Sequence, residues 1–296
     1  MRVDTGSQNQ AKSLLVLGSN SCSRKRRIRK TSKERKAFAL RPAGCGHRHV
    51  FRQIKFWAAI LLMATGSAGA QANEATDAWV RVLHGYVDDR GRVDFARLAG
   101  NPDELTSYVG YIATVSPRST PDVFASADAE LAYYLNSYNA LSMYNVIGSG
   151  IPGSLANLFR RFIFFYWNKF RVGGEKISLY AYENDVIRRL GDERVHFALN
   201  CMSISCPRLP RLPFTVGAVQ SQLDAETRRF FSAARNIRVD HSRQTVEVSE
   251  ILDFYTEDFL AKHPSLIAYI NRYREEQIPV SYAVEFIAYD WTINSQ

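Results

Sequence analysis

The chain has 296 residues, with 38 Lys and Arg against 29 Asp and Glu, which gives a formal net charge of +9. The excess is confined to one end, because residues 1–70 hold 15 basic and two acidic residues, whereas the rest hold 23 basic and 27 acidic ones, a net charge of −4. A mildly acidic domain lacks the electrostatic footprint of a nucleic-acid-binding protein, and we therefore expect no nucleic-acid partner.

Residues 1–51 are predicted to be a disordered basic leader, or chain that precedes the true translation start. The segment is rich in Ser, Arg, Lys and Gly and has no sustained apolar period, so it cannot offset the entropy of ordering. The basic run at 24–30 has an alternative interpretation as a nuclear signal or nucleic-acid-binding arm.

Residues 52–73 have the three parts of a secretory signal peptide. Arg52 and Lys55 form a positive region, residues 56–64 form a short apolar run, and an Ala-x-Ala motif follows at Ala68–Ala70. The run is too short for an ordinary membrane span of about 30 Å, so we expect no stable transmembrane anchor, although an uncleaved N-terminal anchor is the alternative. We therefore expect a periplasmic or secreted protein.

The remaining residues, 74–296, are predicted to form one α+β domain, with a small mixed sheet packed with several helices. In chain order, helices are predicted at 77–86, 102–115, 127–147, 178–190, 215–234, 250–260 and 264–277. Residues 162–172 are aromatic and rich in β-formers, and a turn follows at Gly173–Gly174. Short strands are predicted at 195–199, 237–239, 245–248 and 283–291.

Most of the candidate functional side chains lie in residues 195–210, VHFALNCMSISCPRLP. The predicted strand delivers His196 into a proline-rich loop that holds Asn200, Cys201, Ser205 and Cys206. Polar groups gathered at the end of a strand are typical of binding and catalytic sites.

Three interpretations of the two cysteines remain open. In an oxidising compartment they favour a disulfide, which closes so short a loop that it would contribute only about 2 kcal/mol. Cys201 or Cys206 could instead be a nucleophile with His196 as its base. A metal site that adds a distant ligand such as His241 is a third hypothesis, although the spacing fits no standard zinc site.

Two further constellations lie on predicted helices. Asn136 and Asn139 share one face of the apolar helix 127–147, which indicates a polar network or a site lining, because a buried amide needs partners. In the helix 178–190, Glu183 and Arg188 are five positions apart and do not form an i,i+4 ion pair.

Several motifs occur in order over the predicted domain. They are Trp79, GRVDF (91–95), AYYLNSYNAL (132–141), VGG (172–174), SLYAYE (178–183), VHFALNC and SCP (195–207), FYTEDF (254–259) and YDWTIN (289–294). Together they resemble the domain of unknown function 547 (DUF547) family.

The resemblance implies the boundaries and fold of the domain more than its function. The polar positions that it implies as the family signature are Asn136, Tyr138, Asn139, Glu183, Arg188, His196, Asn200, Cys201, Ser205 and Cys206. The family pattern has a His directly after the helix Glu, where this chain has Asn184. A polar helix paired with a His-bearing strand is also similar in layout to papain-like and transglutaminase-like folds.

Two functional hypotheses follow. The first is a binding or structural module of the cell envelope, in which the Cys201–Cys206 loop frames a polar pocket for a small-molecule or peptide ligand. The second is a thiol-dependent hydrolase or amidase that acts on a peptide-like or acyl substrate, with Cys201 as nucleophile and His196 as base. Neither hypothesis requires a cofactor or a metal ion, and no nucleotide-binding loop, serine-hydrolase elbow or HExxH motif is present.

Overall fold

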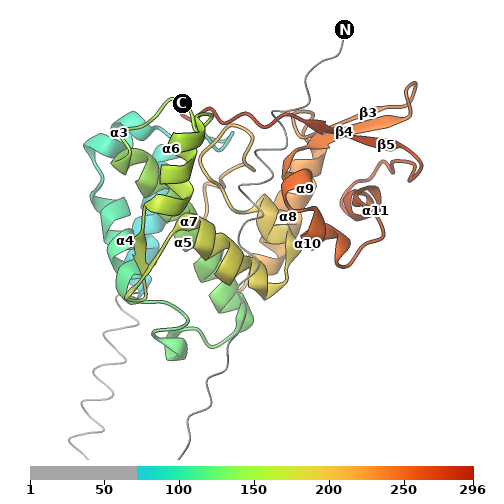
Figure 1. Ribbon diagram of the computed structural model, residues 1–296. Coiled ribbons are helices and arrows are strands. Elements are labelled where there is room, and N and C mark those ends of the chain that lie inside the picture. Colours follow the sequence, from blue (N-terminus) through green and yellow to red (C-terminus); the bar gives the residue numbers. More distant parts are fainter. Residues whose placement is uncertain (1–71) are drawn as a thin grey trace, which may run out of the picture. The chain divides into compact units, whose positions relative to one another are not determined.

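The computed structural model describes residues 72–296, drawn in colour in Figure 1. The predicted basic leader and nearly all of the predicted signal peptide lie outside these residues. Within the described part, no helix is long and apolar enough to cross a membrane. Mixed helices and small sheets confirm the predicted α+β class.

The long helix α5, Ala127–Gly148, is the centre of the fold and confirms the prediction for 127–147 almost to the residue. The side chain of Ser126 caps it by accepting a hydrogen bond from the Ala129 amide. The helix is buried on every side, because it contacts helices on both flanks. The elements packed around it are the helix of residues 72–86, α3 (Phe95–Gly100), α4 (Asp103–Thr114), α7 (Leu179–Ala181) and α8 (Val219–Ser232).

A three-stranded sheet forms the second half of the domain, shown in orange and red in Figure 1. Its strands are β3 (Ile237–Asp240), β4 (Thr245–Ser249) and β5 (Ala283–Ile287), with β3 and β4 antiparallel and β4 and β5 parallel. The helices α9 (Ile251–Phe254), α10 (Thr256–Leu260) and α11 (Leu266–Asn271) accompany it. The sheet is therefore mixed, as predicted, and it packs around an apolar cluster separate from the one at α5.

The C-terminal segment connects the two halves. Figure 1 shows it running from β5 back toward the helices that precede α5 in the chain. Isolated bridges join Ser203 to Ile293, Ser154 to Thr292 and Val93 to Ser295 along this course. The segment therefore lies beside the loop that carries the two cysteines.

The aromatic segment 162–172 is mostly helical, so the β-rich prediction was wrong for most of it. Helix α6 (Leu158–Phe162), capped by Asn157, continues into a π-helical turn η2 at Ile163–Trp167. Only β1 (Phe170–Val172) is extended, and it pairs with β2 (Glu175–Ile177). Gly173 and Gly174 turn the chain between them, with φ values of +57° and +90°.

The predicted strand 195–199 was also wrong, because these residues belong to a 3₁₀ helix, η5, at Glu193–Phe197 and the turn after it. Its apolar residues are buried because the segment passes between the two apolar clusters: Val195 belongs to the first and Phe197 to the second. A short, fully apolar run does not distinguish a strand from a buried helical turn.

Four predicted helices are interrupted or shortened, and one of them, predicted at 215–234, is α8 at Val219–Ser232. After α7, which Ser178 caps, the chain forms a π-helical turn η3 (Tyr182–Ile187) and a 3₁₀ turn η4 (Arg188–Leu190). Tyr255 separates α9 from α10, and α11 covers less than half of the predicted 264–277. A short 3₁₀ turn η1 (Pro121–Val123) precedes α5.

Candidate functional site

The cysteine loop, residues 200–207, is closed by the side chain of Asn200. Its Oδ1 accepts a hydrogen bond from the Met202 amide at 2.6 Å, and its Nδ2 donates to the Pro207 carbonyl at 2.7 Å. Met202 adopts a positive φ of 66°, which is unfavourable for a residue other than glycine. The loop therefore keeps a tight backbone path that the amide of Asn200 holds in place.

Two asparagines of α5 fasten the surrounding backbone. Asn139 accepts from the Asn200 amide at 2.7 Å and donates to the Ala198 carbonyl at 3.0 Å. Asn136 accepts from the Phe214 amide at 3.0 Å and donates to its carbonyl at 2.7 Å. The two amides therefore form a polar network with backbone groups that would otherwise be buried without hydrogen bonds, and Asn136 also accepts from the indole N–H of Trp79 at 3.3 Å.

Ser205 has a similar supporting role. Its Oγ accepts a hydrogen bond from the Asp290 amide at 2.8 Å, and its own amide donates to the Asp290 carbonyl at 3.2 Å. These two bonds attach the cysteine loop to the C-terminal segment.

Cys201 and Cys206 are free thiols with their sulfur atoms 2.6 Å apart, so the disulfide that the sequence favoured is not shown. The Cys201 amide donates to the sulfur of Cys206 at 3.0 Å. The Tyr289 hydroxyl lies 3.0 Å from the sulfur of Cys206 and 3.4 Å from that of Cys201. The two thiols and this phenol thus form one hydrogen-bonded group.

The two thiols differ in acidity and exposure. The hydrogen bond from Cys206 lowers the pKa of Cys201 to about 7, whereas burial raises the pKa of Cys206 well above its ordinary value. Cys201 is half-buried and Cys206 is buried. Because nucleophilic reactivity follows the thiolate, Cys201 is the thiol that ionises first and that a reagent can reach.

His196 is fixed by a carboxylate that the sequence analysis did not single out. Its Nε2 lies 2.7 Å from Oδ2 of Asp258, and its ring stacks on Tyr255 with centroids 3.8 Å apart. A carboxylate only accepts hydrogen bonds, so Nε2 carries a proton, and in the neutral imidazole the lone pair lies on Nδ1. Within the described residues Nδ1 is buried and has no hydrogen-bond partner.

Arg188 holds that carboxylate in place. Its Nε and Nη2 donate to Asp258 at 2.7 and 2.8 Å, and its Nη1 donates to Asn184. Burial raises the pKa of Asp258, but the hydrogen bonds from His196 and Arg188 outweigh it and lower the pKa below its ordinary value. Asn184, which stands where the family pattern has His, therefore positions Arg188.

Glu183 is buried and accepts hydrogen bonds from two tyrosines. The Tyr138 hydroxyl donates to Oε2 at 2.7 Å, and the Tyr255 hydroxyl donates to Oε1. The carboxylate thus has hydrogen-bond donors on both oxygens, as a buried acid requires.

A cavity of about 70 Å³ brings part of the predicted set together. Five of the ten predicted residues line it, namely Tyr138, Glu183, His196, Cys201 and Cys206. The other five, Asn136, Asn139, Arg188, Asn200 and Ser205, support its walls through the hydrogen bonds described above. Aromatic side chains complete the lining, among them Phe165, Phe254, Tyr255, Tyr289 and Trp291.

The structure does not bring together the ligands of the predicted metal site. His241 lies after β3, where its Nδ1 is 2.9 Å from the Tyr282 hydroxyl. Among residues 72–296, no three His, Cys, Asp or Glu side chains are grouped so that they could hold a metal ion.

The fold and the cavity define an α+β domain whose site combines an acidic thiol, a buried partner thiol and a carboxylate-bound histidine. Residues 124–231 match the family model described as "Protein of unknown function, DUF547", which confirms the predicted resemblance. The match covers 108 of the 296 residues, so it shows a similarity to this family over part of the chain. No curated protein and no solved structure matches the chain. The matched segment contains His196 and both cysteines, whereas Asp258 and Tyr289 lie beyond it.

Proposed function

We propose that this protein is an exported thiol-dependent hydrolase or amidase that acts on peptide-like or acyl substrates. The observation that carries the proposal is the state of His196: one nitrogen is held by Asp258, and the other is buried without a partner in the wall of a cavity that Cys201 also lines. A general base must present a free lone pair near the proton that it removes.

In the proposed reaction the Cys201 thiol gives its proton to Nδ1 of His196, and the thiolate attacks the carbonyl carbon of the substrate. The carbon–sulfur bond forms, and the tetrahedral adduct collapses as the imidazolium returns the proton to the departing amine or alcohol. Water, deprotonated by the same nitrogen, then attacks the thioester. The acid product leaves, and the proton returns to the thiol.

Asp258 and Arg188 act as positioning residues in this scheme. The carboxylate fixes the tautomer of His196 and stabilises the imidazolium that forms after proton transfer. The bidentate contact from Arg188 keeps the carboxylate ionised and correctly oriented.

Iodoacetamide labelling and acyl-ester hydrolysis test the proposal. Reduced wild-type protein should release p-nitrophenol from p-nitrophenyl acetate, and both His196→Ala and Cys201→Ser should reduce that rate at least a hundredfold. His241→Ala is the matched control, because His241 lies outside the cavity, and it should leave the rate unchanged. Equal rates in wild type and Cys201→Ser would refute a thiol mechanism.

The binding or structural module remains the second candidate, and the contact between the two sulfurs favours it. In that case the cysteines become a disulfide in the oxidising compartment and frame the pocket. Intact mass after alkylation separates the candidates: no label without reductant and two labels with it would favour the frame. One or two rapid labels without reductant, slowed in His196→Ala, would favour the enzyme.

Export is the part of the proposal that rests on the sequence alone. The three-part pattern at 52–73 supports cleavage between Ala70 and Glu74. N-terminal sequencing of protein from the envelope fraction tests it. A mature chain that still begins before Arg52 would refute it.

A further inference from the structure

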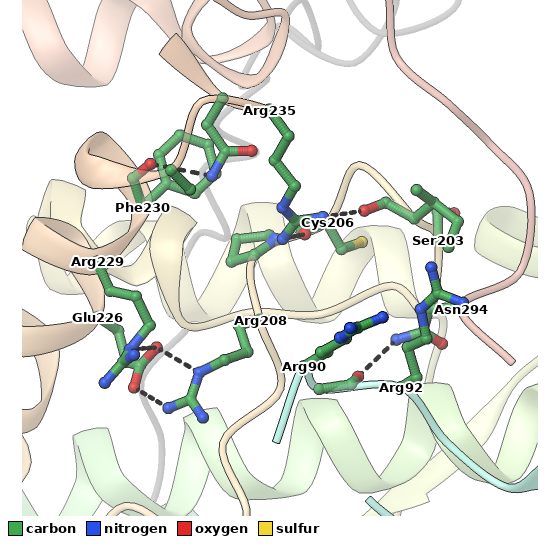
Figure 2. Close-up of a pocket in the computed structure, with 15 residues that line it drawn as sticks. Arg90, Arg92, Ser203, Cys206, Arg208, Glu226, Arg229, Phe230, Arg235 and Asn294 are labelled. Atoms are coloured by element: carbon green, nitrogen blue, oxygen red, sulfur yellow. Dashed lines mark hydrogen bonds and ion pairs between the residues drawn. The ribbon is translucent and has the colours of Figure 1, made fainter. Parts of the chain in front are cut away.

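A second and larger cavity is also lined by residues of the cysteine loop. Its volume is about 390 Å³, and Cys206 and Pro207 line both this cavity and the one that holds His196. We call it the arginine pocket, because five arginines line it: Arg90, Arg92, Arg208, Arg229 and Arg235 (Figure 2). Its volume is in the range of sites that hold small molecules.

The charges in the arginine pocket are strongly unbalanced. Among residues 72–296, Glu226 is the only carboxylate in its lining, and it is shared between Arg208 at 2.6 Å and Arg229 at 3.7 Å. Within the described residues, no hydrogen bond or ion pair engages the side chains of Arg90 and Arg92. Five positive charges against one negative charge face a single cavity, although the chain from residue 71 onward has a net charge of −4.

Two further side chains in the arginine pocket, those of Arg235 and Asn294, are held in place by hydrogen bonds to the backbone. Arg235 is anchored by hydrogen bonds from its guanidinium to the carbonyls of Ile204, at 2.5 Å, and Cys206, at 3.2 Å. Asn294 is 5% exposed, and its Nδ2 donates to the Gly91 carbonyl at 3.1 Å. Its Oδ1 is buried and accepts nothing from the described residues, so it requires a donor from a ligand or water.

Like charges that line one cavity repel each other, and an oxyanion relieves this repulsion through the paired N–H groups of arginine. We propose that the arginine pocket binds a small oxyanion that also carries a hydroxyl group. The guanidinium groups hold the anionic oxygens, and the hydroxyl donates to Oδ1 of Asn294. Inorganic phosphate and hydroxycarboxylates share this chemistry.

Isothermal titration calorimetry of the purified protein with inorganic phosphate, citrate and sulfate tests the proposal. At neutral pH phosphate and citrate each carry a hydroxyl donor, whereas sulfate carries none. We expect at least one of the first two to bind tenfold more tightly than sulfate. Tighter binding of phosphate identifies phosphate itself as the ligand class, and tighter binding of citrate identifies hydroxycarboxylates.

Substitution of Arg90 and Arg92 together by Gln should weaken that binding at least tenfold. Arg189→Gln is the control, because Arg189 is exposed and does not line the pocket, and it should change the affinity less than twofold. Circular dichroism verifies that each variant is folded. The proposal is overturned if neither hydroxyl-bearing anion binds better than sulfate, or if the double variant binds as wild type does. Repeating the titration in Cys201→Ser keeps this test separate from the thiol chemistry.

Discussion

Replacing Asn139 by Ala removes the clamp between α5 and the segment that leads into the cysteine loop. The Asn139 side chain is buried, and it makes one hydrogen bond to the Ala198 carbonyl and one from the Asn200 amide, at 3.0 and 2.7 Å. Each buried backbone group left without a partner costs about 1–3 kcal/mol. The better helix propensity of Ala offsets roughly 0.5 kcal/mol of this. We therefore expect the free energy of unfolding to fall by about 2–5 kcal/mol.

Urea-induced unfolding followed by circular dichroism measures the change, with the slope of the transition as a check that only stability has changed. Asn101→Ala is the control, because Asn101 is exposed and donates one hydrogen bond to the Arg97 carbonyl at 3.2 Å. Its cost should stay below about 0.5 kcal/mol. A loss below about 1 kcal/mol for Asn139→Ala would refute the reasoning, because it would mean that water or another group satisfies both backbone atoms.

Three further predictions follow from the pKa values and the backbone. The rate at which iodoacetamide labels the reduced protein should rise with pH, with a midpoint near the Cys201 pKa of about 7. Cys206→Ala should move that midpoint upward, because it removes the main hydrogen bond to the Cys201 thiolate. An unmoved midpoint would contradict this. The pKa of Asp258 is lowered in the folded state, so its contribution to stability is complete above the unfolded-state pKa of about 4 and is lost as the pH falls below that value. The free energies of unfolding of wild type and Asp258→Asn, measured in urea, should therefore approach each other toward pH 2. A difference that stays constant with pH would count against the ion pair. Gly173→Ala should lower the melting temperature more than Gly174→Ala. Both glycines have a positive φ, but only at Gly173 would an added Cβ collide with the hydroxyl groups of two serines. Equal shifts in melting temperature would show that the backbone strain alone matters.

The elements that the sequence predicted best are those with a complete local signal. Helix α5 has a cap at Ser126, a long apolar run and Gly148 at its end, so both boundaries were correct within a residue. Strands β3 and β4 were correct because a polar turn separates two short apolar runs. The turn η5 was missed because burial on both sides removes the alternation that would reveal its conformation.

The candidate site was predicted only in part. His196, Cys201 and Cys206 line one cavity, and the sequence grouped them because they are close along the chain. Asp258 is 62 positions from His196, and no spacing rule connects them. Its only signal was its place in the FYTEDF motif of the family resemblance. The two asparagines of α5 were recognised as buried amides, but only the structure shows that their partners are backbone groups and the Trp79 indole.

The position of η5 between the two apolar clusters affects how the domain opens. Val195 and Phe197, on either side of His196, pack into different clusters. Tyr138 belongs to the first cluster, whereas Tyr255 packs against the second, and both donate hydrogen bonds to Glu183. The two clusters therefore share η5 and the hydrogen bonds to Glu183, so unfolding of one cluster removes packing from the other. In native-state hydrogen exchange, the slowest amides of the two halves should consequently report similar opening free energies, as in a single cooperative unit.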